Sequence, residues 1–87
     1  MIVWRGVVVS YSDAAAAEIT DLCWNGHDVR EILERGREAK RKRKAGIIEV
    51  CLEKRGRVRK IVLAESIQRW SGEVVWLVIH AGEYARG

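Results

Sequence analysis

The chain has 87 residues, of which 48% are hydrophobic, and carries 16 Lys and Arg against 12 Asp and Glu. A chain of this length forms one domain, residues 1–87, and buries only about 60 to 65% of the surface that its unfolded form exposes, so we expect a homodimer to add burial. The longest apolar stretch, residues 74–79, is too short to span a bilayer, which argues against a membrane protein and favours a cytoplasmic one.

Polar uncharged residues are scarce, with one Asn, one Gln and one Thr against 32% charged residues. Few amides together with many Glu, Lys and Arg are typical of thermophilic proteins, so we expect a thermophilic source. Drift in the composition of a short chain is the alternative.

The two cysteines, Cys23 and Cys51, belong to no C-x-x-C pair, and Cys23 with His27 lacks a second pair of ligands. We therefore expect neither a metal nor a cofactor, and we interpret both cysteines as small buried hydrophobic residues. A disulfide between them stays open, because thermophilic organisms tolerate intracellular bridges.

The first half of the chain predicts a strand followed by two helices. Residues 2–9 are β-branched and nearly continuous, which predicts one strand interrupted by Gly6. Residues 14–24 predict a first helix, with N-cap candidates before it and Asn25-Gly26 as its stop. The candidates are Ser10, Ser12 and Asp13, and the apolar stripe is Ala15, Ile19, Leu22 and Cys23.

A second helix is predicted to begin at Asp28, which forms a capping-box pattern with Glu31. Its end stays open. It stops at Gly36 or runs on to Lys44, because residues 37–44 favour helix while Gly36 and the crowding of like charges oppose it.

Residues 48–53 and 58–64 predict a β-hairpin that turns at Arg55-Gly56, so that Lys54 opposes Arg57. In this register one face is predicted to pack on the helices, and it carries Ile48, Val50, Leu52, Arg59, Ile61 and Leu63. The other face is predicted to stay open and polar, and it carries Glu49, Cys51, Glu53, Val58, Lys60 and Val62.

After a loop at residues 65–73, residues 74–81 are almost wholly apolar, which predicts a central strand with His80 at its end. The expected fold is α+β with the order β-α-α-β-β-β, in which a helical hairpin packs on one face of a mainly antiparallel four-stranded sheet.

Charge is concentrated in residues 37–60, which hold eleven of the sixteen cations against three carboxylates, a net charge of about +8. Residues 40–44 are five consecutive cations, and a polyanion would relieve their repulsion. A solvated face or an ion-pair network is the alternative.

In the loop, the tryptophan beside Arg69 is predicted to stack on a base, unless it caps the core or fills a dimer interface. The predicted nucleic-acid-binding residues are Arg37, Lys40, Arg41, Lys42, Arg43, Lys44, Lys54, Arg55, Arg57, Arg59, Arg69 and Trp70.

The order of elements, with a helical pair near the start, a basic hairpin and a closing apolar strand that ends in polar residues, resembles the RelE/ParE toxin superfamily and the small domain families related to it. The resemblance covers nearly the whole chain. It implies a protein that binds RNA on the ribosome through the open sheet face and is neutralised by an antitoxin. Active members are metal-independent endoribonucleases in which the 2′-hydroxyl attacks the neighbouring phosphate.

One recurrent scheme of that superfamily places a carboxylate on the second strand, a basic residue on the third, and His or Tyr at the end of the fourth. In this sequence those places hold Glu49 or Glu53, then Arg59 or Lys60, then His80 and Tyr84. Lys60 is the better of the two cations, because the predicted register puts it on the open face.

Each candidate also has an ordinary structural interpretation. His80 suits a hydrogen-bonded core histidine, and Glu49 and Glu53 suit cross-strand ion pairs with Lys60. The alternative function is a non-catalytic dimeric interaction module whose basic patch contacts nucleic acid or an acidic protein. Non-specific binding of duplex DNA is a third possibility.

Overall fold

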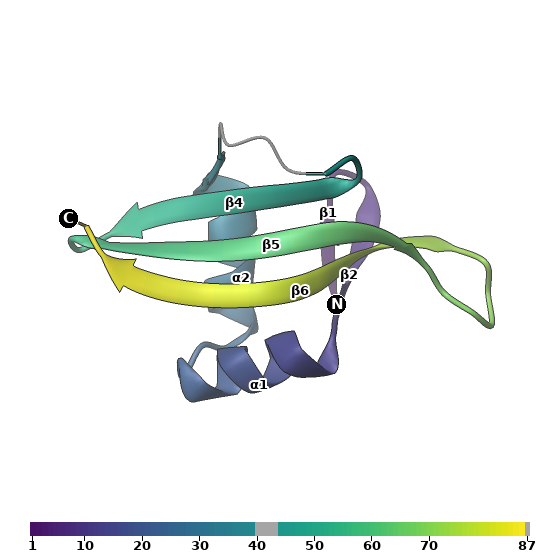
Figure 1. The fold of residues 1–87 in the computed structure, drawn as a ribbon, viewed down its shortest axis with the longest axis horizontal. Helices are drawn as coiled ribbons and strands as arrows, with labels where there is room; N and C mark the ends of the chain where they lie inside the picture. Colours follow the sequence, from purple (N-terminus) through teal and green to yellow (C-terminus); the bar gives the residue numbers. More distant parts are fainter. Residues whose placement is uncertain (40–43, 87) are drawn as a thin grey trace.

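The computed structural model describes residues 1–39 and 44–86, which form an α+β fold measuring 42 × 27 × 21 Å. One six-stranded sheet has the strand order β1-β2-β6-β5-β4-β3, and every pairing is antiparallel except β2 with β6. The α+β class is as predicted. The predicted order β-α-α-β-β-β with four strands was wrong, because the first strand is a hairpin of two strands and a further short strand follows the second helix. The elements in chain order are β1 (Ile2–Trp4), β2 (Val7–Tyr11), α1 (Asp13–Asp21), α2 (Gly26–Arg35), β3 (Arg37–Glu38), β4 (Ile47–Lys54), β5 (Arg57–Ile67) and β6 (Val74–Ala85) (Figure 1).

The first predicted strand is a hairpin of two short strands. Arg5 and Gly6 both have positive φ, 50° and 77°, as a two-residue turn with the hairpin twist requires. The chain therefore folds back on itself, with Ile2 opposite Val9. The prediction of a single strand was wrong, because Arg5 and Gly6 form a turn between two strands.

Helix α1 begins after Ser12, whose hydroxyl oxygen accepts a hydrogen bond from the Ala15 N–H at 3.1 Å. It ends at Asp21, earlier than predicted, because Cys23 takes a left-handed φ of 59° that no helix continues. Cys23 is exposed, which corrects the prediction of a buried residue, and it forms no disulfide with Cys51.

Helix α2 begins one turn earlier than predicted. Its capping box joins Asn25 to Asp28, each side chain accepting from the other's backbone N–H, at 3.1 and 2.8 Å. The predicted box of Asp28 with Glu31 was wrong. The helix ends at Arg35, which excludes its continuation to Lys44.

The hairpin of β4 and β5 has the predicted register. Lys54 pairs with Arg57 across a turn in which Arg55 and Gly56 both have positive φ, 54° and 76°. The predicted pairs of Ile48 with Leu63, Val50 with Ile61 and Leu52 with Arg59 are all present.

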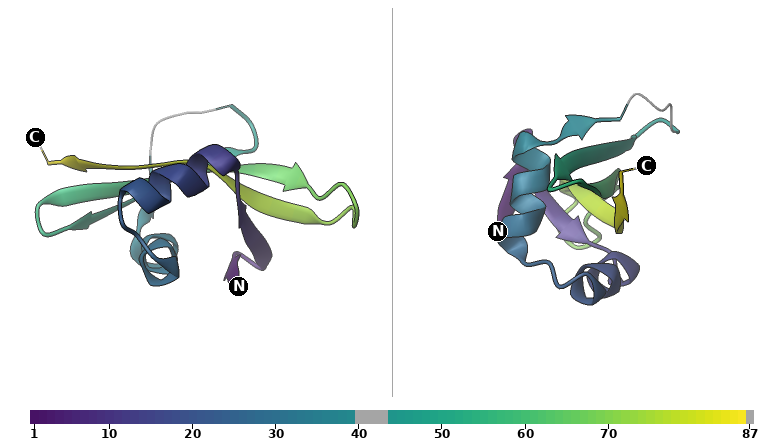
Figure 2. Two further views of the ribbon diagram at one scale, coloured as in Figure 1. Left: turned by 90° about the horizontal axis from the view of Figure 1, so that it is seen from below. Right: turned by 90° about the vertical axis from the view of Figure 1, so that its left-hand side faces the viewer.

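Strand β6 is longer than predicted, so His80 lies inside the strand and not at its end. Strand β5 also runs on to Ile67, which reduces the predicted loop to residues 68–73. The parallel strand β2 covers only residues 76–78 of β6. Beyond that point α1 lies along the edge of β6 (Figure 2).

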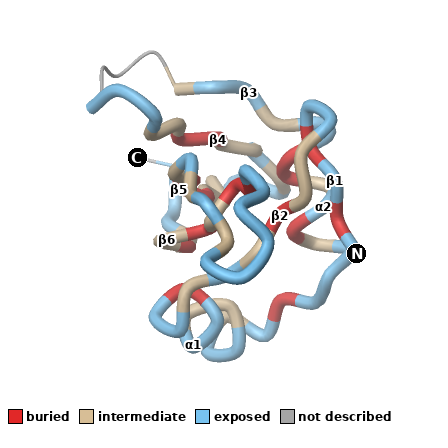
Figure 3. The backbone as a smooth tube through the Cα atoms, turned by 90° about the vertical axis from the view of Figure 1, so that its right-hand side faces the viewer, coloured by how far each residue is buried: buried red, intermediate tan, exposed pale blue. Residues whose placement is uncertain are grey.

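The hydrophobic core lies between the sheet and the helices, and Figure 1 looks onto the opposite face of the sheet, with α2 behind the strands. Burial is concentrated at the centre of the molecule, while the turns are exposed (Figure 3). The core includes Trp4, whose indole N–H donates to the Leu33 carbonyl at 3.0 Å and whose ring lies 5.4 Å from that of Trp76. Among the described residues, neither helix has the length and apolar character needed to cross a membrane.

Candidate functional site

The sheet face that points away from the core, here called the open face, carries three rows of side chains across β4, β5 and β6. The register gives the rows Glu49–Val62–His80, Cys51–Lys60–Gly82 and Glu53–Val58–Tyr84. All five predicted catalytic residues lie on this face, and Arg59 lies on the packed face, as its predicted register requires. Neighbouring strands are about 4.8 Å apart, so the two carboxylates on β4 stand about 10 Å from β6.

Gly82 is the centre of the best-formed group of polar side chains. A Cβ atom at this position would lie 3.5 Å from both His80 Nε2 and Lys60 Cε, so the missing side chain leaves room between the imidazole and the ammonium stem. The Lys60 Nζ atom lies 6.0 Å from the centre of the Tyr84 ring. Lys60, His80 and Tyr84 therefore surround one small open area of the sheet.

Glu18 on α1 orients His80. Its Oε2 and Oε1 atoms lie 2.9 and 3.1 Å from His80 Nδ1, and Oε1 also accepts the Ala81 N–H at 3.2 Å. A carboxylate only accepts, so Nδ1 carries the proton, and in the neutral ring the lone pair is on Nε2, the atom beside Gly82. The His80 side chain is 43% exposed, which rules out a buried core histidine.

Glu18 was not among the predicted site residues. The contact joins residues 62 apart, from a helix to a strand, and the sequence contains no local pattern for it. Gly82 was missed as well, although a glycine inside a strand is a known sign of close approach by another group.

The two carboxylates on β4 do not reach His80. Glu49 is buried and accepts a weak hydrogen bond from the Cys51 thiol at 3.8 Å, and Glu53 contacts Arg86 at 2.6 Å. The carboxylate beside the imidazole therefore comes from α1, and not from the second strand of the predicted scheme.

The predicted nucleic-acid-binding cations other than Arg69 fall into three groups. Lys40, Arg41, Lys42 and Arg43 lie outside the described residues. Arg37, Lys44 and Arg55 are exposed. The remaining three on the hairpin, Lys54, Arg57 and Arg59, contact carboxylates.

These three cations tie the hairpin to α2 and β6. Arg59 donates to Asp28 at 3.1 Å and to Glu83 at 2.9 Å, and its guanidinium lies 5.3 Å from the Trp24 ring centre. The Asn25 N–H and then Arg59 lower the pKa of Asp28, and hydrogen bonds from Arg59 and Arg57 lower the pKa of Glu83. Their charge is thus partly matched within the fold.

Ion pairing with Lys54 follows the same pattern at α2. Its ammonium lies 2.8 Å from Glu31, and this hydrogen bond lowers the pKa of the Glu31 carboxyl. The prediction of an ion-pair network as the alternative role of the basic residues therefore applies to this part of the hairpin.

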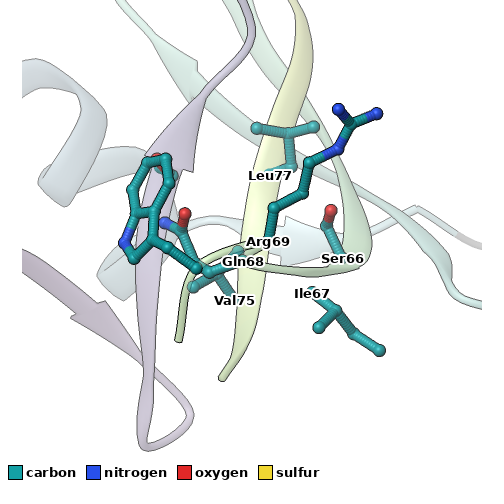
Figure 4. A pocket seen from close by; sticks show the side chains of 8 residues that line it. Ser66, Ile67, Gln68, Arg69, Val75 and Leu77 are labelled. Atoms are coloured by element: carbon teal, nitrogen blue, oxygen red, sulfur yellow. The ribbon is translucent and has the colours of Figure 1, made fainter. Parts of the chain in front are cut away.

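Arg69 and Trp70 lie at the far end of the β5–β6 hairpin, beside a hollow of about 220 Å³. Trp70 is 87% exposed, so it does not cap the core. Figure 4 shows the Arg69 side chain extending past Leu77 and Ser66, with the Gln68 amide pointing the other way. This hollow, here called the hairpin hollow, is separate from the group around Gly82.

No model of a protein family matches the chain, and neither a curated protein nor a solved structure does. The described residues contain no group of three His, Cys, Asp or Glu side chains placed to hold a metal ion.

Proposed function

We propose that this chain is an RNA-binding protein of the RelE/ParE kind that cuts the strand on its open face, between His80 and Lys60. The observation that carries the proposal is the group of Lys60, His80 and Tyr84 around Gly82, with Glu18 holding the imidazole. An acid or base, a cation and a hydroxyl around a gap are the parts that phosphodiester cleavage needs.

In the proposed reaction His80 Nε2 takes the proton of the 2′-hydroxyl, and the resulting oxygen attacks the neighbouring phosphorus. The bond from phosphorus to the 5′-oxygen breaks, and Tyr84 gives that oxygen a proton. The products are a 2′,3′-cyclic phosphate and a 5′-hydroxyl. Lys60 stabilises the negative charge that grows on the phosphate oxygens.

Binding of the strand rests on charge. The net charge is +4, and residues 37–60 hold eleven of the sixteen cations. Of those that the structure describes, Arg37, Lys44 and Arg55 are exposed and Lys60 lies on the open face. Phosphate contacts of this kind give affinity without sequence specificity, so affinity for a generic RNA should fall steeply between about 50 and 200 mM salt. Replacing residues 40–44 by glutamine should flatten that dependence, and an unchanged slope would argue against these cations as the RNA contact.

Cleavage is tested with an end-labelled RNA, alone and with ribosomes, at the temperature at which the protein is stable. His80→Ala should lower the rate by about 100-fold or more, the usual contribution of a general base. Its matched control is His27→Ala, which removes an exposed histidine from α2. Equal rates for the two variants would remove His80 from the reaction, and an RNA that stays intact in both conditions would leave only binding.

Gly82→Ala tests the role of the open area at Gly82 separately from the stability of the fold. The new methyl group would make only ordinary contacts at 3.5 Å, so stability should hold or rise slightly. It would occupy the place proposed for the phosphate, and we expect cleavage to fall by about 10-fold or more. Full activity in this variant would place the reaction elsewhere.

A non-catalytic dimeric module is the second candidate, because apolar side chains are exposed at the end of the β5–β6 hairpin. Trp70, Ile67 and Val74 are 87, 66 and 56% exposed. A second copy, or an antitoxin in a toxin pair, would cover them. Sedimentation at micromolar concentration tests the homodimer, and a particle of 9.9 kDa would exclude it under those conditions.

A further inference from the structure

The hairpin hollow combines an exposed aromatic ring with a small number of polar groups. The other tryptophans, Trp4, Trp24 and Trp76, are all buried in the core, whereas Trp70 leaves 87% of its surface in solvent. An indole held this way contributes little to the core. The exposed ring is therefore available to stack on a flat ligand.

The lining of the hollow suits one nucleobase. The lining includes the apolar side chains of Val75 and Leu77 on β6, and Ser10, Ser66 and Gln68 contribute hydrogen-bond donors and acceptors. A base has a flat face that stacks on an indole and an edge that forms hydrogen bonds, and the volume of about 220 Å³ leaves room for it.

Charge at the hollow favours a base that belongs to a nucleic-acid strand. Arg69 extends beside Ser66 at the rim, as Figure 4 shows, where it can meet a phosphate group. A guanidinium at this place would not favour a purely apolar occupant.

The hollow lies on the open face. Leu77 and Ser66 point away from the core by the alternation of their strands, as His80 and Lys60 do, with a β-bulge after Val62 between the two groups. Gly82 follows Leu77 by five positions along β6, about 16 Å at roughly 3.3 Å per residue. Stacked nucleotides rise about 3.4 Å each, so this length holds about five of them, or fewer in an extended strand.

We propose that the hairpin hollow binds one unstacked base of the same RNA strand whose phosphate lies at Gly82, two to five nucleotides from the bond that is cut. This inference rests on the proposed function and adds a subsite to it. The subsite fixes the strand along β6 and gives the protein a length requirement that phosphate contacts alone do not impose.

The test uses ten-nucleotide RNAs with 2′-O-methyl groups, which lack the attacking hydroxyl and stay intact. One abasic nucleotide is moved along the strand, and affinity is measured by fluorescence anisotropy. For the unaltered protein, one position should lower affinity by about 10-fold, as loss of a stacked base does. Trp70→Ala should lower affinity for the full strand by a similar factor and abolish the positional effect.

Val74→Ala is the matched control, because Val74 is exposed on the same hairpin and is not among the residues that line the hollow. Its affinity and positional effect should equal those of the unaltered protein. Cleavage of the unmodified strand then locates the cut, which should lie two to five nucleotides from the sensitive position.

Three results would overturn the inference. If RNA binds but no abasic position lowers affinity, or if Trp70→Ala binds RNA as tightly as the unaltered protein, the subsite is excluded and the proposed function is unaffected. RNA that does not bind at all removes both. A Trp70→Ala protein that binds RNA normally but loses a dimer seen for the unaltered protein assigns the hollow to a second copy of the chain.

Discussion

Replacing Arg59 by methionine should lower the free energy of unfolding by about 2 to 3 kcal/mol. The change keeps an unbranched apolar side chain at this position but removes hydrogen bonds to Asp28 and Glu83, at 3.1 and 2.9 Å, and the cation above the indole ring of Trp24. Neither carboxylate is left alone, because Asp28 keeps the Asn25 N–H at 2.8 Å and Glu83 keeps Arg57 at 3.1 Å.

The magnitude follows from how far these groups are from bulk water. Fully exposed ion pairs contribute about 0 to 1 kcal/mol and charge-assisted hydrogen bonds about 1.5 to 3. The Arg59, Asp28 and Glu83 side chains are 21, 27 and 18% exposed, which favours about 1 kcal/mol for each contact. The cation–π contact adds about 0.5 to 1 kcal/mol. For a domain of this size the total lowers the melting temperature by about 10 to 20 °C.

The same variant should change how stability depends on pH. The pKa values of Asp28 and Glu83 lie below their ordinary values of 3.8 and 4.5 in the folded chain. A carboxyl whose pKa is lowered by folding stabilises the protein above the ordinary value, and this contribution is lost as the pH falls through the lowered one. The free energy of unfolding should therefore decrease as the pH is lowered below about 4.5, and it should decrease less steeply in Arg59→Met.

Urea denaturation between pH 7 and pH 2.5 measures both effects. The control is Arg30→Met, a change to an exposed arginine on α2, which should stay within about 0.5 kcal/mol of the unaltered protein. An equally small change for Arg59→Met, or an unaltered acid limb, would refute this account of the network.

Three further changes test the fold that positions the site. Gly36→Ala should destabilise by about 3 kcal/mol or more, because its Cβ would lie 2.3 Å from the Ile32 carbonyl oxygen and 2.7 Å from that of Cys51. Gly26→Ala is its control, since a Cβ there meets nothing within 4 Å, and denaturation should separate the two clearly. Asn25→Ala should lower stability by about 1 kcal/mol through loss of the capping box, and an unchanged denaturation midpoint would contradict that role. Trp4→Phe should lower stability by about 1 to 3 kcal/mol, because the buried Leu33 carbonyl loses its donor. An unchanged denaturation midpoint would show that this hydrogen bond does not contribute.

The register and the turn of the central hairpin could be predicted, because two independent signals agreed. The alternation of Ile48, Val50 and Leu52 fixed which side chains share a face, and Arg55-Gly56 fixed the turn. The same dipeptide at Arg5-Gly6 was not recognised, because a three-residue strand is too short to show alternation beside it. Local patterns therefore predicted the long hairpin and missed the short one.

The capping box of α2 shows a different limit. The usual pattern has Glu or Gln three residues after the cap, and this led to Asp28 with Glu31. Here Asp28 is itself the third residue after Asn25, and its shorter carboxylate still reaches the backbone N–H at 2.8 Å. The pattern was present but with a different acid.

Glu18 was beyond sequence reasoning because its role depends on how the sheet ends. Strand β2 pairs with β6 only as far as Val78, which leaves the Ala81 N–H at an uncovered edge. Helix α1 lies along that edge, and the Glu18 carboxylate accepts this N–H and the His80 Nδ1–H together. One carboxylate thus accepts the hydrogen bond of an unpaired strand-edge N–H and also fixes the tautomer of the imidazole beside Gly82. The residue that accepts this edge N–H also sets the geometry of the proposed site, so Glu18→Gln should change the His80 tautomer seen by nitrogen NMR together with any cleavage rate.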